Sequence, residues 1–158
     1  IRALRGEGVS GVVIGCLTPD GRIDQERTRA LVEAARPMSV TCHRAFDMTA
    51  DAGEALEALV RCGVDRVLTS GQRDTAVEGI AILKSAVEQA AGGIVIMGCG
   101  VLDAENIREV RDGAGLAEIG GLHGGSPVRC LSVDTLLPPA PLCDNPVHPE
   151  QAVRFSEQ

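Results

Sequence analysis

The sequence predicts an α/β protein in which parallel strands alternate with helices. Apolar runs of strand length recur along the chain at a period of about 25 to 30 residues, the size of one strand–helix unit. These runs are apolar at consecutive positions, as is typical of parallel strands that helices cover. The expected strands are residues 11–17, 40–43, 66–71, 94–97 and 116–119.

Capping residues and apolar spacing predict the helices between these strands. The first helix runs to Ala35 and ends before Pro37, and the second ends at Gly63, which accepts the left-handed conformation that follows many helices. Asp51 with Glu54 has the spacing of a capping box. The expected helix starts are, in chain order, Asp24, Asp51, Thr75 and Asp103.

The chain divides into residues 1–126, which carry this pattern, and residues 127–158, in which the pattern fails. Prolines at positions 138, 139, 141 and 146 interfere with regular structure in the second part. We therefore expect one domain over residues 1–126 and an irregular, proline-rich tail over residues 127–158 that carries no chemistry.

The composition argues against two classes of partner. The chain has no Trp or Tyr, only two Phe and a net charge of −7, so we expect no binding to nucleic acid. No apolar run approaches the ~18 residues that a membrane span needs, and no signal peptide is visible.

The six cysteines contain no C-x-x-C pair and fit reduced core thiols, so we expect a cytoplasmic protein.

The main candidate site follows the second strand, where His43, Arg44 and Asp47 lie within five residues. Alternation along the strand puts His43 on the face opposite Cys42. Arg44 offers a planar set of donors for a carboxylate or phosphate, and His43 can act as a general acid or base near neutral pH. We assign the candidate catalytic role to these three residues. The structural alternative is an Arg44–Asp47 ion pair beside a histidine that only ends a strand.

Polar and glycine residues after the later strands are candidate ligand-binding groups. Hydroxyls at a strand end can bind a ligand or bond locally to the backbone. Glycines let the backbone approach an anion, and the helix start at Asp103 offers free N–H groups, although these glycines also suit simple turns. The candidate ligand-binding residues are Thr69, Ser70, Gly98, Gly100, His123 and Gly124.

Several of these segments resemble one known family, the copper homeostasis protein CutC. The similar segments are GVVIGCLTPDGRID (11–24), VTCHRAFDMT (40–49), GVDRVLTSG (63–71), residues 96–100 with 105–107, and His123-Gly124. The resemblance extends over residues 1–126. It implies a TIM-type (β/α)₈ barrel, which carries its functional residues on loops at the carboxyl ends of the strands. It also implies a role in copper homeostasis or copper tolerance.

The chain departs from the family pattern in its length. A (β/α)₈ barrel has eight units and typically ~250 residues, and the family's first three strands have no counterpart here. We expect a partial barrel of about five βα units, with a five-stranded doubly wound parallel sheet as the alternative. The open edges of a partial barrel favour pairing with a second copy, and hence a homo-oligomer.

Copper binding and an enzymatic activity are both open as functions. The cysteines most often proposed as copper ligands in the family lie in the part without a counterpart. The remaining candidate ligands near strand ends are Cys16, Cys99 and His123, which are soft or imidazole ligands that suit Cu(I). The alternative is a barrel-type enzyme that uses His43 and Arg44 on a small phosphate or carboxylate substrate. The third interpretation is an incomplete gene product without activity.

Overall fold

Strands and helices alternate in the computed structural model, which describes residues 1, 8–121 and 129–132. The strands are β1 (Gly11–Ile14), β2 (Ser39–Cys42), β3 (Arg66–Thr69), β4 (Val95–Gly98), β5 (Glu118–Gly121) and β6 (Arg129–Ser132). The helices are α1 (Gln25–Ala35), α2 (Ala52–Cys62), α3 (Ile80–Ala90) and α4 (Ile107–Ala114), and a short 3₁₀ helix, η2 (Arg44–Met48), follows β2. The predicted alternation is confirmed.

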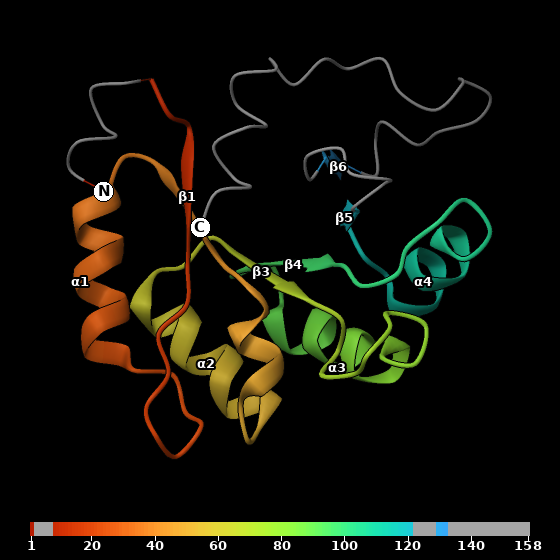
Figure 1. Ribbon diagram of the computed structural model, residues 1–158, viewed down its shortest axis with the longest axis horizontal. Helices are drawn as coiled ribbons and strands as arrows, with labels where there is room; N and C mark the ends of the chain where they lie inside the picture. The colour runs from red at the N-terminus through yellow and green to blue at the C-terminus, as the bar shows by residue number, and fades with distance from the viewer. Residues whose placement is uncertain (2–7, 122–128, 133–158) are drawn as a thin grey trace.

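The sheet topology decides between the two predicted architectures. The strands lie in the order β1-β2-β3-β4-β5-β6, and β1 to β5 are parallel. Each helix contacts the next one along the chain, and α1 to α4 cover the same side of the sheet (Figure 1). A doubly wound sheet reverses its strand order and carries helices on both faces. The barrel-type prediction is therefore confirmed, and the doubly wound alternative is wrong.

The first two helices begin and end where the sequence predicts. The Asp24 carboxylate accepts a hydrogen bond from the Arg27 amide at 3.0 Å, and Asp51 accepts one from the Glu54 amide at 2.8 Å. Gly63 ends α2 in the left-handed conformation, with φ 77°. These caps satisfy amides that have no partner inside the helix.

The other two helices begin later than predicted, at Ile80 and Ile107 instead of near Thr75 and Asp103. The hydrogen bond expected at the first of these starts does form, because the Thr75 hydroxyl accepts from the Glu78 amide at 3.2 Å. It closes a separate turn that precedes α3. Gly79 lies so close to β3 that an added Cβ would meet the Ser70 carbonyl oxygen at 1.8 Å. This close approach sets where α3 starts, and residue pattern alone does not show it.

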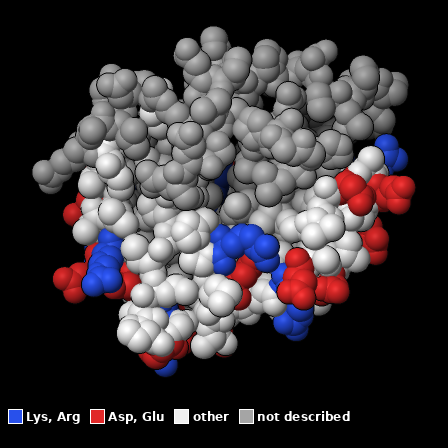
Figure 2. All heavy atoms as spheres, viewed as in Figure 1, with Lys and Arg blue, Asp and Glu red and all other residues white. Residues whose placement is uncertain are grey.

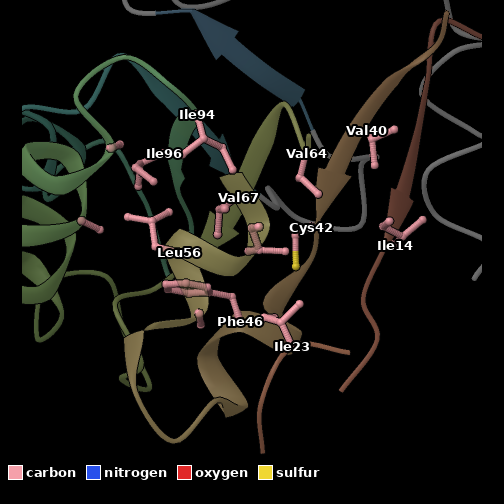
Figure 3. Packing of buried hydrophobic residues seen from close by; sticks show 14 of the residues in the cluster. Ile14, Ile23, Val40, Cys42, Phe46, Leu56, Val64, Val67, Ile94 and Ile96 are labelled. Atoms are coloured by element: carbon pink, nitrogen blue, oxygen red, sulfur yellow. The ribbon is translucent and has the colours of Figure 1, made fainter. Parts of the chain in front are cut away.

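The core lies between the sheet and its helices. Val40 and Cys42 of β2 and Val67 of β3 are buried against Leu56 of α2 and Phe46 of η2 (Figure 3). Phe46 is fully buried, so it anchors η2, which follows β2 and contacts β3. The core therefore holds the short helix that carries two of the candidate site residues.

Charged side chains of both signs lie together on the surface. On the described part of the face in Figure 2, acidic residues lie beside basic ones, and the charges do not form a patch of one sign. In the part of the chain that the structure describes, no helix has the length and apolar character that a bilayer span requires.

One strand lies inside the segment predicted to be irregular. β6 pairs antiparallel with β5, from Glu118 opposite Ser132 to Gly121 opposite Arg129. Antiparallel pairing needs only a short connection, which explains how a strand can form so soon after β5. Residues 133–158 lie outside the described residues, so the division into a domain and an irregular tail stays a prediction.

Candidate functional site

The candidate site lies where β2 and β3 end. Val40 and Cys42 are buried and His43 is exposed, so the predicted alternation along β2 is confirmed. The chain then turns into η2, which carries Arg44 and Asp47 toward the end of β3. The structure brings Arg44 and Asp47 together with Thr69 and Ser70, four residues that the sequence singled out as two separate groups.

Asp47 is the centre of this cluster. Its side chain is only 7% exposed, and its Oδ2 lies 2.7 Å from Arg44 Nε. It also accepts hydrogen bonds from the Thr69 hydroxyl, from the Ser70 amide at 3.2 Å and from the Gln72 amide at 3.2 Å. Burial raises the pKa of Asp47, but the hydrogen bonds from Thr69, Arg44, Ser70 and Gln72 outweigh burial and hold the pKa below its usual value.

Arg44 is held in one orientation by this carboxylate. Its Nη2 donates to the Ser70 hydroxyl at 2.8 Å and to the Arg73 carbonyl at 3.3 Å, while Nε donates to Asp47. The hydrogen bond to Asp47 raises the pKa of Arg44 above its usual value. The side chain is 48% exposed, and no described residue accepts from Nη1. Nη1 is therefore the one guanidinium nitrogen of Arg44 without an acceptor among the described residues.

Ser70 is fully buried and works as a hydrogen-bonding link. Its hydroxyl accepts from Arg44 and lies 3.0 Å from Asp47 Oδ2 and within hydrogen-bond distance of the Arg73 carbonyl. A hydroxyl has one hydrogen, so it donates to only one of these acceptors at a time. Among the described residues no imidazole bonds to Ser70, so the arrangement suits positioning and not nucleophilic attack.

His43 stands apart from the Arg44–Asp47 pair. Its Nδ1 accepts a hydrogen bond from the Ala45 amide at 3.0 Å and so caps η2. In the tautomer that this bond selects, Nε2 carries the hydrogen and can serve a ligand as a donor. The ring lies over Gly15, where an added Cβ would be 2.3 Å from His43 Cε1. The ring therefore faces the end of β1, and its predicted acid–base role stays a prediction.

Gln72 belongs to the cluster, although the sequence analysis missed it. Its backbone has φ 56°, a left-handed conformation that is uncommon outside glycine, and this points its amide at Asp47. Its side-chain Nε2 donates to the Thr49 carbonyl and to the Thr49 hydroxyl, both at 2.9 Å. Gln72 thus ties the loop after β3 to the end of η2. A glutamine after a strand carries no sequence signal for this role.

The glycines after β4 have structural reasons to be glycine. A Cβ on Gly98 would lie 2.5 Å from Leu116 Cδ1, and a Cβ on Gly100 would lie 2.9 Å from Ser70 Cβ. The Asp103 carboxylate accepts from the amides of Glu105 and Asn106 at 2.9 Å each, so a carboxylate already occupies these N–H groups. Ligand binding by Gly98 and Gly100 stays a prediction, and so does that by Thr69 and Ser70.

The remaining candidates concern a metal. Cys42, Cys62 and Cys99 are buried free thiols and Cys16 is partly buried. Burial raises the pKa of both Cys42 and Cys99 to about 12. Within residues 1, 8–121 and 129–132 no three His, Cys, Asp or Glu residues form a group suited to a metal ion. His123 and Gly124 lie outside the described residues.

The fold and the site define an α/β protein of the barrel type whose polar residues gather at the carboxyl ends of the strands. The CutC family model matches residues 1–125, and the chain belongs to the CutC family. The predicted resemblance is confirmed.

Two relatives illustrate the similarity in sequence. The chain is 61% identical over 119 residues to a family protein CutC of Mesorhizobium japonicum, a match that covers 75% of this chain and 46% of the relative. It is 44% identical over 118 residues to the copper homeostasis protein cutC homolog of Homo sapiens, covering 75% of this chain and 43% of the relative. The chain therefore spans about half the length of the relatives that it matches.

A solved structure supports the barrel assignment. The crystal structure of a copper homeostasis protein CutC from Streptococcus agalactiae matches with a TM-score of 0.71 at 28% identity. The match covers 76% of this chain and 59% of that chain. The described strands and helices thus correspond to part of a longer fold.

Proposed function

We propose that this chain acts in copper homeostasis and binds a small anionic molecule at the carboxyl ends of β2 and β3. The copper homeostasis role is supported by the names of the human and mouse relatives, each 44% identical to this chain over 118 residues. The anion site is supported by one observation above all: Asp47, Ser70 and a backbone carbonyl orient Arg44, whose Nη1 has no partner among the described residues. Such a preorganised guanidinium binds oxyanions at little entropic cost.

The residues of the site have distinct roles in this proposal. Arg44 donates to the anion through Nη1, and Asp47 is a positioning residue, because protein donors already occupy both of its carboxylate oxygens. His43 lies apart from this pair, with its ring over Gly15, so we assign the contact with the anion to Arg44 and not to His43.

Calorimetric titration of the 158-residue chain with inorganic phosphate and with acetate tests the anion site. Arg44→Gln removes the free guanidinium edge, and we expect it to weaken binding at least about tenfold, the range of a charged hydrogen bond. Arg61→Gln, on the exposed side of α2, makes the same change in net charge and serves as the control. Equal affinities for the parent and Arg44→Gln would overturn the proposal.

Direct binding of Cu(I) is the second candidate. It is favoured by two free thiols that follow parallel strands at the same edge of the sheet, Cys16 after β1 and Cys99 after β4. Thiolate and imidazole are ligands that Cu(I) prefers, and His123 would supply the imidazole. Copper is then the cargo of the protein, and its binding must displace the thiol protons.

Competition against a chromophoric Cu(I) chelator tests this second candidate. We expect Cys16→Ser and Cys99→Ser to lower the Cu(I) affinity, because each removes a soft ligand. Cys62→Ser is the control, because Cys62 is also buried but lies at the end of α2, where the chain leads into the start of β3. If all three variants bind Cu(I) like the parent, Cys16 and Cys99 are not ligands.

We also propose a cytoplasmic location and self-association. The free thiols of the described residues fit a reducing compartment. Among the described residues β1 pairs only with β2, and an open strand edge favours pairing with a second copy. Light scattering gives the mass in solution, and a monomer at all concentrations would exclude the self-association.

A further inference from the structure

We propose that Arg73 supplies the net positive charge that attracts an anion to this site, whereas Arg44 supplies the oriented N–H donors. This inference rests on the proposed anion site. It names a ligand-binding residue that neither the sequence pattern nor the family comparison singles out, and it assigns the ligand to the class of small oxyanions such as inorganic phosphate.

Arg44 contributes almost no net charge to the site. Its Nε lies 2.7 Å from the carboxylate of Asp47, and that side chain is 7% exposed and accepts hydrogen bonds from Thr69, Ser70 and Gln72. Both charges belong to one tight pair, so their fields cancel a few ångströms away. A bound anion therefore feels the hydrogen-bond donors of Arg44 more than its charge.

Arg73 lies at the same rim, in the loop between β3 and α3. Its carbonyl accepts from Arg44 Nη2 at 3.3 Å, and its own Nη1 donates to the preceding carbonyl, that of Gln72, at 3.1 Å. The backbone of Arg73 therefore contacts Arg44 directly, and the side chain of Arg73 extends from this point of contact. Arg73 is exposed and forms no ion pair with a described residue, so its charge is not neutralised locally.

Asp74, the residue after Arg73, carries the opposite charge and therefore allows a second test. Asp74 is exposed, its carboxylate accepts no hydrogen bond from a described residue, and its charge acts on Arg44. A carboxylate at this rim repels an incoming anion, while Arg73 attracts it. Neutralising Arg73 should therefore lower the anion affinity, and neutralising Asp74 should raise it. A general loss of folding would lower the affinity in both variants.

The experiment is a calorimetric titration of the full 158-residue chain with inorganic phosphate at low and at high salt. Arg73→Gln should weaken phosphate binding about tenfold at low salt, the order expected of one exposed charge near contact distance, and should reduce the salt dependence. Asp74→Asn should tighten binding, and Arg73→Lys should retain most of the affinity because it retains the charge. Arg61→Gln, at the far end of α2 with the same charge change, should match the parent.

The outcomes separate this inference from the proposed function. If Arg44→Gln weakens phosphate binding but Arg73→Gln binds it like the parent at low salt, the role of Arg73 is wrong and the anion site stands. A parent chain that binds neither phosphate nor acetate overturns both. Weaker binding by Arg61→Gln and Arg73→Gln alike would show that only the overall charge matters, and this also overturns the inference.

Discussion

Two buried polar regions of this molecule are built in opposite ways. At the ends of β2 and β3, the buried Asp47 carboxylate accepts hydrogen bonds from four residues of η2 and of the end and loop of β3. In α1, the hydroxyl of Thr28 is buried, with the residue 2% exposed, and has no hydrogen-bond partner among the described residues. A satisfied network ties elements together and orients a side chain, whereas an unpartnered hydroxyl only lowers stability. This difference distinguishes a constructed site from an ordinary helix position.

The largest effect is expected when the satisfied network loses its centre. Asp47→Ala leaves donors from Arg44, Thr69, Ser70 and Gln72 without their acceptor, and we expect it to lower the free energy of unfolding by about 3 kcal/mol. Urea denaturation measures the change. Asp112→Ala, which removes an exposed carboxylate, should leave the free energy of unfolding unchanged. An equal loss in both variants would contradict the role of Asp47.

A methyl group at the end of β1 should have the next largest effect. Gly15→Ala places its Cβ against His43 Cε1 and within 2.8 Å of Ala45 Cβ, so the ring must move and lose its hydrogen bond to the Ala45 amide. We expect a loss of about 1.5 kcal/mol in the free energy of unfolding. In a His43→Ala background the same change should cost clearly less. A cost that does not depend on His43 would show that the ring does not lie over Gly15.

The pH dependence of stability tests the ionisation of the Asp47 network. The pKa of Asp47 is lowered in the folded protein, so its contribution is present above the ordinary value of 3.8 and is lost as the pH falls through the folded pKa. We expect the free energy of unfolding to decrease below about pH 4, and to decrease less steeply in Asp47→Asn. Chemical unfolding at several pH values measures both slopes, and parallel curves would contradict the prediction.

The smallest effect has the opposite sign and comes from the unsatisfied region. Thr28→Val replaces a buried hydroxyl that has no partner among the described residues by a methyl group, and we expect it to raise the free energy of unfolding by about 1 kcal/mol. Thr49 is also buried, but its hydroxyl donates to the Phe46 carbonyl at 2.8 Å and accepts from Gln72. Thr49→Val should therefore lower stability by about the same amount. Thermal denaturation of the two variants tests whether their stabilities change in opposite directions. Stabilisation of both variants would contradict the difference between Thr28 and Thr49.

Much of the fold could be predicted because it depends on local chemistry. Apolar runs, the caps at Asp24 and Asp51 and the stop at Gly63 all act over a few residues, and the structure confirms them. The late starts of α3 and α4 could not be predicted. That of α3 goes with the close approach of Gly79 to Ser70, which follows β3.

The site was predicted in part, for the same reason. Arg44, Asp47, Thr69 and Ser70 were found because charged and hydroxyl residues directly follow apolar strands. Gln72 was missed because its contribution is a backbone amide aimed by a positive φ. The placement of His43 beside Gly15, away from the ion pair, depends on a contact between two strands.

The sequence by itself determined the α/β class, the strand order along the chain, the family and the residue types at the strand ends, because each follows from local pattern or motif. Only the tertiary structure decided that the helices share one side of the sheet and that both oxygens of Asp47 accept hydrogen bonds from the protein. It also decided that Arg44 binds the Arg73 carbonyl and that its Nη1 has no acceptor among the described residues. The physical reason is distance. Hydrogen bonds and charges act over a few ångströms, and residues as far apart in the chain as Arg44 and Arg73 come within that range only when β2 and β3 lie side by side.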